Sequence, residues 1–69
     1  MVCSRMRLER IKRGLTQKAL ADKTGGIVSQ VVISQLEHGR RPRPDEALAL
    51  AYALKVSEQE LFAEQMSET

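Results

Sequence analysis

The 69-residue sequence contains one cysteine, one histidine and no tryptophan. Cys3 has no second cysteine with which to form an internal disulfide, and Cys3 and His38 alone do not make a metal site. No apolar run approaches the ~20 residues that span a bilayer. Residues 1–7 lack the apolar core of a signal peptide. We therefore expect a cytoplasmic chain with no disulfide, no metal and no cofactor.

Catalytic patterns are also missing from the sequence. No nucleophile is paired with a base, and there is no glycine-rich phosphate loop. The carboxylates after residue 44 are interpreted as helix caps or solvated charges rather than as a catalytic pair; they include Asp45, Glu46, Glu58 and Glu60. The sequence therefore predicts a protein that is not an enzyme.

The length of the chain and the distribution of its charges give the first indication of its fold and of what it binds. A chain of 69 residues accommodates one domain, which we take to be residues 1–69. Domains of this size bury only about 60% of their unfolded surface, so a helical bundle with short loops is the economical solution. Residues 1–43 contain ten Lys and Arg against three Asp and Glu, whereas residues 44–69 contain one lysine against six acids. The basic part is where a polyanion would bind.

Residues 16–39 predict two short helices joined by a glycine-containing turn. Thr16 is a residue type that caps helix N-termini, and Gly25 is the type that closes helices. The next segment, residues 27–33, is rich in β-branched residues and by propensity alone predicts a strand. We favour a helix there, because Ser29 can cap its N-terminus and a glycine follows its C-terminus. Such a pair is a helix-turn-helix, whose second helix enters the DNA major groove.

The other helices are predicted from caps and apolar spacing. Residues 4–13 and 45–54 each begin with a residue type that caps helices, and residues 57–60 form a capping box that starts a last helix. Residues 64–69 are expected to be a frayed polar tail. The apolar stripes of these helices are Met6, Leu8 and Ile11; Ile33 and Leu36; Ala47, Leu48, Leu50, Ala51 and Leu54; and Leu61 and Phe62.

An ordered set of motifs carries a family resemblance. The motifs are Gly14-Leu15-Thr16-Gln17, Leu20-Ala21, Val28-Ser29-Gln30 with Ile33-Ser34, Glu37-His38-Gly39-Arg40, Pro44, residues 48–54, Val56-Ser57 and Leu61-Phe62. At these positions the chain resembles the Cro/CI repressor-like, or XRE-type, helix-turn-helix family. The resemblance covers nearly the whole chain and implies an all-α, compact five-helix fold like that of lambda repressor. The turn at residues 25–28 is about two residues longer than the family's, which costs little closure entropy but is enough to tilt the second helix.

The resemblance implies which residues of the helix-turn-helix contact DNA. Phosphate contacts are expected at the start of its first helix, from Thr16, Gln17 and Lys18. For Thr16 the alternative is a helix cap and nothing more. Base contacts are expected from the exposed face of the second helix, where glutamine amides can bond adenine and aliphatic groups can touch thymine methyls. These residues are Gln30, Val31, Ser34 and Gln35, and the alternative for the two glutamines is that they are ordinary surface residues.

Residues 40–44 form a basic loop that two prolines keep extended. Planar guanidinium groups bond phosphate bidentately. We therefore expect phosphate contacts from Arg40, Arg41 and Arg43, with a merely soluble loop as the alternative.

Arg10 falls on or beside the apolar stripe of the first helix. An arginine there must bury its stem and pair its head, because an unpaired buried charge is costly. The family resemblance implies that its partner is Glu37. Two separately solvated charges are the alternative.

Together the charge and the resemblance imply a sequence-specific transcriptional regulator, most simply a repressor or autoregulator. A single helix-turn-helix buries limited surface on DNA, so we expect a homodimer on a palindromic double-stranded operator with half-sites about 34 Å apart. The dimer surface is expected on the last helix and at its junction with the helix of residues 45–54, with Phe62 or Met66 as the anchor. Phe62 has the equal alternative of closing the monomer core. A second hypothesis is an antitoxin-type or other protein-interaction module with auxiliary DNA binding, which the acidic residues 44–69 keep open.

Overall fold

The computed structural model describes the backbone of residues 4–66 and the side chains of residues 4–62. This part of the chain forms five α-helices and no strand. The helices are α1 (Arg5–Lys12), α2 (Gln17–Lys23), α3 (Gln30–Glu37), α4 (Pro44–Leu54) and α5 (Glu58–Met66). The predicted all-α, five-helix architecture is confirmed, and the β-branched segment at residues 27–33 does not form a strand.

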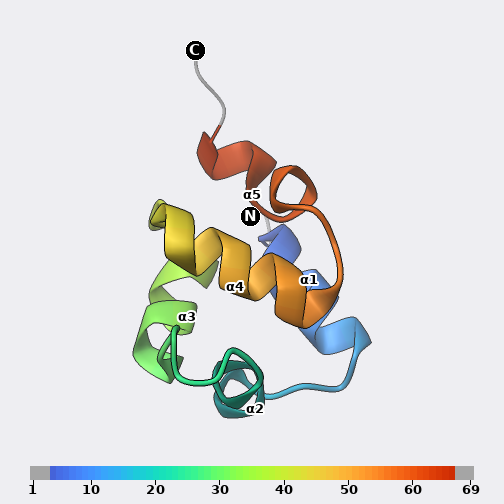
Figure 1. Cartoon of the computed structure of the whole chain (residues 1–69). Helices are drawn as coiled ribbons and strands as arrows, with labels where there is room; N and C mark the ends of the chain where they lie inside the picture. The colour runs from blue at the N-terminus through green and yellow to red at the C-terminus, as the bar shows by residue number, and fades with distance from the viewer. Residues whose placement is uncertain (1–3, 67–69) are drawn as a thin grey trace.

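The helices pack around α4. Contacts join α2 to α3, α1 to α5, and α4 to both α2 and α5. Figure 1 shows α4 across the middle of the molecule, with α2 and α3 towards one side and α5 towards the other. The α2–α3 pair therefore forms one flank of the bundle.

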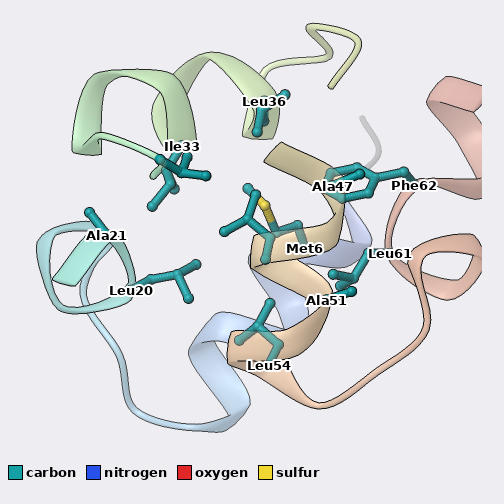
Figure 2. Close-up of a cluster of buried hydrophobic side chains, with 12 residues drawn as sticks. Met6, Leu20, Ala21, Ile33, Leu36, Ala47, Ala51, Leu54, Leu61 and Phe62 are labelled. Carbon is teal, nitrogen blue, oxygen red and sulfur yellow. The ribbon is translucent and has the colours of Figure 1, made fainter. Parts of the chain in front are cut away.

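One apolar core joins all five helices (Figure 2). Met6 of α1, Leu50 of α4 and Phe62 of α5 each have 0% exposed surface. The remaining buried apolar residues are Leu20, Ala21, Val28, Ile33, Leu36, Ala47, Ala51, Leu54 and Leu61. Of the two roles open for Phe62, the structure shows the one that closes the monomer core.

Three residues of the predicted apolar stripes lie outside this core. Leu8 is 45% exposed, Ile11 53% and Leu48 61%. Each helical residue turns the side chain by about 100°. Leu8 follows the buried Met6 by two positions, and Leu48 precedes the buried Leu50 by two, so both lie about 200° from the core side of their helices. Ile11 follows Met6 by five positions and lies about 140° from it. The prediction was wrong at these three positions because it accepted apolar residues that are not on the same side of the helix as the buried ones.

Three helices begin with the predicted hydroxyl caps. The side-chain oxygens of Ser4, Thr16 and Ser29 each accept a hydrogen bond from the backbone N–H three residues later, at 3.1, 3.0 and 3.2 Å. Each cap satisfies one of the N–H groups that a helix start leaves without an intrahelical partner. The predicted starts of α1, α2 and α3 are therefore confirmed.

α4 begins one residue earlier than predicted. Pro44 occupies its first turn, and Arg43 is the N-cap. The Arg43 N–H donates to Glu46 Oε1 at 3.0 Å. Proline suits the first helical position because the missing N–H would have no partner there. Asp45 is therefore inside the helix and is not its cap.

α5 begins at the predicted capping box, where the Ser57 hydroxyl accepts from the Glu60 N–H at 3.1 Å. The helix continues to Met66, with non-helical backbone angles at Phe62 (φ −124°, ψ 23°). The backbone of residues 64–66 is thus helical where a frayed tail was expected. Residues 67–69 of that expected tail, and Cys3, lie outside the described residues.

Candidate nucleic-acid interface

The core fixes which face of α3 is exposed. Ile33 and Leu36 have 0% exposed surface and hold one side of α3 in the core, as the sequence predicts. On the other side Gln30 and Gln35 are exposed, Val31 is 65% exposed and Ser34 is half-buried. The four residues expected to contact bases therefore lie on α3 clear of the core, and they offer two amides, a hydroxyl and an aliphatic group.

A threonine clamps the long turn between α2 and α3. The Thr24 hydroxyl donates to the Ala21 carbonyl at 2.6 Å and accepts from the Val28 N–H at 3.1 Å. Thr24 is 7% exposed and Val28 is 1% exposed. The extra turn residues therefore form a closed loop whose end is anchored in the core, and α3 still packs on α2. This clamp was not predicted from the sequence, because a threonine ahead of two glycines resembles an ordinary helix end.

Glu37, the last residue of α3, is the centre of a tertiary hydrogen-bond cluster. Arg10 Nε donates to Glu37 Oε2 at 2.6 Å, and Arg10 Nη2 donates to Glu37 Oε1 at 3.2 Å. Arg10 Nη1 also donates to the Leu15 carbonyl at 2.8 Å. The two charged side chains are only 12% and 4% exposed, so they are paired rather than separately solvated.

The same carboxylate fixes the start of α2 beside the end of α3. Gln17 Nε2 donates to Glu37 Oε1 at 3.1 Å. Thr16 caps α2, so the structure shows its cap role, and its side chain remains exposed. Lys18 is also exposed, with its ammonium nitrogen 3.8 Å from Asp22 Oδ2. Of the three residues expected to contact phosphate at α2, Gln17 therefore contacts the C-terminal end of α3, and Thr16 and Lys18 are its exposed neighbours in the chain.

The chain leaves α3 through a glycine. Gly39 has φ +105°, and the N–H groups of Gly39 and Arg40 bond back to Leu36 and Gln35 carbonyls at 3.1 and 3.0 Å. This pattern closes a helix by satisfying its last carbonyls. The basic loop therefore leaves α3 at the end where α2 begins. The loop comprises residues 40–43, because Pro44 already belongs to α4.

The structure divides the three loop arginines into two kinds. Arg41 and Arg43 are exposed. Arg40 is partly covered: Nη1 donates to Gln35 Oε1 at 3.3 Å, and Nη2 lies 3.5 Å from Glu46 Oε2. Arg40 therefore links α3 to α4 as well as carrying positive charge. This link was not predicted.

A second carboxylate cluster lies on α1 and was also missed. Glu9 is 4% exposed. Arg13 donates to Glu9 Oε1 at 2.6 Å, and Arg5 donates to Glu9 Oε2 at 3.1 Å. These hydrogen bonds, first from Arg13 and then from Arg5, lower the pKa of Glu9 from 4.5 to about 2. The signal was present in the sequence, since both arginines lie four positions from Glu9.

The described helices and side chains hold neither a membrane span nor a metal site. No helix among the described residues is long and apolar enough to cross a bilayer. Within the same part of the chain, no three His, Cys, Asp or Glu side chains are placed to hold a metal ion.

A helix-turn-helix with an exposed polar face on its second helix, set beside a basic loop, defines a DNA-binding domain. The comparison with protein families agrees. The model of a family described as helix-turn-helix matches residues 6–61. The chain therefore belongs to the Cro/CI-type, or XRE, helix-turn-helix family of DNA-binding transcription regulators. No solved structure matches the chain significantly.

Proposed function

We propose that this DNA-binding regulator is a sequence-specific repressor that binds a palindromic operator as a dimer and controls its own gene. The observation that carries the proposal is the exposed face of α3, which presents Gln30, Val31, Ser34 and Gln35 from a helix whose opposite side is fixed in the core. A rigidly held helix of this kind can place side chains reproducibly against base edges.

The side chains on that face suit the major groove. A glutamine amide can accept from adenine N6 and donate to adenine N7 at once, and a valine can contact a thymine methyl. Gln30 and Val31 lie at the first turn of α3, which is the part of a recognition helix that reaches base edges. Gln35 lies further along α3, and its bond to Arg40 orients its amide.

Phosphate anchors support the other end of α3. Thr16, Lys18 and Arg41 are exposed near the point where α2 begins and the basic loop leaves α3. Contacts to phosphate fix the position and register of a protein on the duplex without reading sequence. The arrangement therefore separates reading residues on α3 from anchoring residues around it. Arg43 lies further along the loop and adds a fourth anchor.

The first test compares binding of the purified chain to its own upstream DNA and to a scrambled DNA of equal length, across a salt series. Gln30→Ala and Gln35→Ala should each lose about tenfold or more of the preference for upstream DNA, because a bidentate base contact is worth about 1–3 kcal/mol. Arg41→Ala should weaken binding to both DNAs alike and lower the salt slope by about one.

Lys12→Ala is the matched control for the charge lost in Arg41→Ala. Lys12 lies two positions past Arg10, so it is on the side of α1 away from the Arg10–Glu37 pair. Its removal should change affinity less than removal of Arg41. Equal binding of the wild-type chain to both DNAs, lost as salt rises, would contradict the proposal and would favour a protein-interaction module with auxiliary DNA binding.

A further inference from the structure

The outer face of α4 carries a second set of regularly spaced residues. The inner face is formed by Ala47, Leu50, Ala51 and Leu54, which are buried. On the outer face Leu48 is 61% exposed and Tyr52 is 85% exposed, and Asp45 and Lys55 are exposed before and after them. The outer positions 45, 48 and 52 follow the alternating three- and four-residue spacing of a seam between two packed helices. Lys55 is the left-handed C-cap of α4 and lines the same groove as Leu48 and Tyr52.

Hollows flank this outer face. One groove of about 870 Å³ is lined by residues that include Leu48, Tyr52, Lys55 and Val56. Another of about 400 Å³ is lined by residues that include Ile27, Asp45, Leu48 and Tyr52. Leu48 and Tyr52 border both grooves, so they form an apolar ridge between two depressions. A ridge next to a groove is the shape that two identical surfaces need in order to interlock.

The charges on this face are arranged for antiparallel pairing with itself. Asp45 and Lys55 lie five positions to either side of residue 50, and Leu48 and Tyr52 lie two positions to either side. A two-fold axis at that level would place Leu48 against Tyr52 of a second copy, and Asp45 against Lys55. Parallel pairing would instead oppose Asp45 to Asp45 and Lys55 to Lys55. Antiparallel pairing also opposes the two helix dipoles favourably.

We infer that the outer face of α4 binds a second copy of this chain, with the two α4 helices antiparallel across a two-fold axis. The inference deepens the proposed function and rests on it for the existence of a dimer, whose surface that proposal leaves open. It also replaces the dimer anchor expected at Phe62, because Phe62 has 0% exposed surface. The side chain of Met66 lies outside the described residues.

A charge-swap experiment tests the pairing directly. Asp45→Lys alone would oppose two lysines at each end of the seam, and Lys55→Glu alone would oppose two acids. Each variant should therefore be monomeric in sedimentation equilibrium at concentrations where the wild-type chain dimerises. An equimolar mixture of the two should dimerise again, because each interface would then pair one lysine with one acid. Circular dichroism shows whether each single variant is folded.

Removal of the ridge gives an independent readout. Tyr52→Ser should raise the dissociation constant of the dimer by about tenfold or more, as expected for a central aromatic anchor. Ile11→Ser is the matched control, since Ile11 is an exposed apolar residue on α1. A wild-type chain that stays monomeric at high micromolar concentration would overturn the inference. So would single charge variants that dimerise like the wild type, or a mixture that remains monomeric.

The inference and the proposed function fail in different ways. If the charge swap restores a dimer that shows no preference for its upstream DNA, the α4 interface stands and the sequence-specific repressor does not. If the upstream preference is found but the α4 variants sediment like the wild type, the proposed function stands and this interface is wrong.

Discussion

Glu9 and Glu37 are both carboxylates with almost no exposed surface, but their partners come from different parts of the fold. Their side chains are 5% and 4% exposed. Glu9 is surrounded by cations of its own helix and its C-cap, which are Arg5, Lys12 and Arg13. Glu37 stands at the end of α3 and bonds to Arg10 of α1 and Gln17 of α2.

The two clusters therefore support different parts of the structure. The Glu9 cluster supports one helix, and the Glu37 cluster holds together the helices that carry the proposed DNA-binding surface. Each cation of the Glu9 cluster is at most four positions from Glu9, so the cluster can form as soon as α1 forms. The Glu37 cluster joins residues 27 and 20 positions apart, so it exists only when α1, α2 and α3 are assembled. The hydrogen bonds of Glu37 therefore depend on tertiary structure, whereas those of Glu9 depend only on α1 and its C-cap.

The largest expected effect is on the tertiary pair. Arg10→Met should destabilise the chain by about 3–5 kcal/mol, because removal of one partner leaves a buried charge uncompensated. Urea unfolding measures the loss. Lys12→Met is the control, since its 68% exposed side chain lies 3.6 Å from Glu9 and should contribute little.

The double variant tests whether Arg10 and Glu37 act as a pair. Arg10→Met with Glu37→Leu should be less destabilised than the sum of the single variants, because no charge is then left buried alone. Additive effects in this double-mutant cycle would contradict the pairing.

A smaller effect is expected at the start of α2. Gln17→Ala removes one hydrogen bond to Glu37 and should cost about 1 kcal/mol in urea unfolding. Lys18→Ala is the neighbouring control, and it should change stability by only a few tenths of a kcal/mol, because that side chain and Asp22 are 75% and 73% exposed. Equal losses in the two variants would mean that the Gln17–Glu37 bond does not hold α2.

The smallest effect is expected for the local cluster, because its two arginine side chains are 49% and 34% exposed to screening solvent, and it has a signature in acid. The pKa of Glu9 is about 2 in the fold against an ordinary 4.5. A lowered pKa stabilises the folded chain above pH 4.5, and this contribution is lost as the pH falls through about 2. Wild-type thermal stability should therefore drop more steeply across this window than that of Glu9→Gln. Parallel pH profiles would show that Glu9 is not held by its arginines.

The starts of the helices could be predicted from the sequence. Which apolar residues of a helix face the core was harder to predict. Hydroxyl residues at positions 4, 16 and 29 predicted three helix starts, because a cap and its N–H partner are three residues apart. Leu48 was misplaced in the core because apolar character alone does not say which side of a helix is covered. If the α4 surface binds a second copy, the same leucine is apolar for a reason outside the monomer.

The candidate site shows the same division. The exposed face of α3 follows from the inward positions of Ile33 and Leu36, so its residues could be listed in advance. The Arg10–Glu37 pair came from the family resemblance and from no local pattern, because 27 residues separate its members. The Thr24 clamp and the Arg40–Glu46 link depend on how loops fold back onto helices. Periodicity carries no information about such contacts.

The two helices of the DNA-binding motif are very short, and this has a consequence for the lifetime of the protein. α2 contains seven residues and α3 eight, whereas isolated helices shorter than about 12–15 residues are marginal in water. The proposed DNA-contacting surface therefore exists only in the folded chain, and bound DNA must raise the free energy of unfolding by mass action. Proteases act on opened chains, so molecules on DNA will be degraded more slowly than free ones. The turnover of this regulator is thereby coupled to its occupancy of DNA.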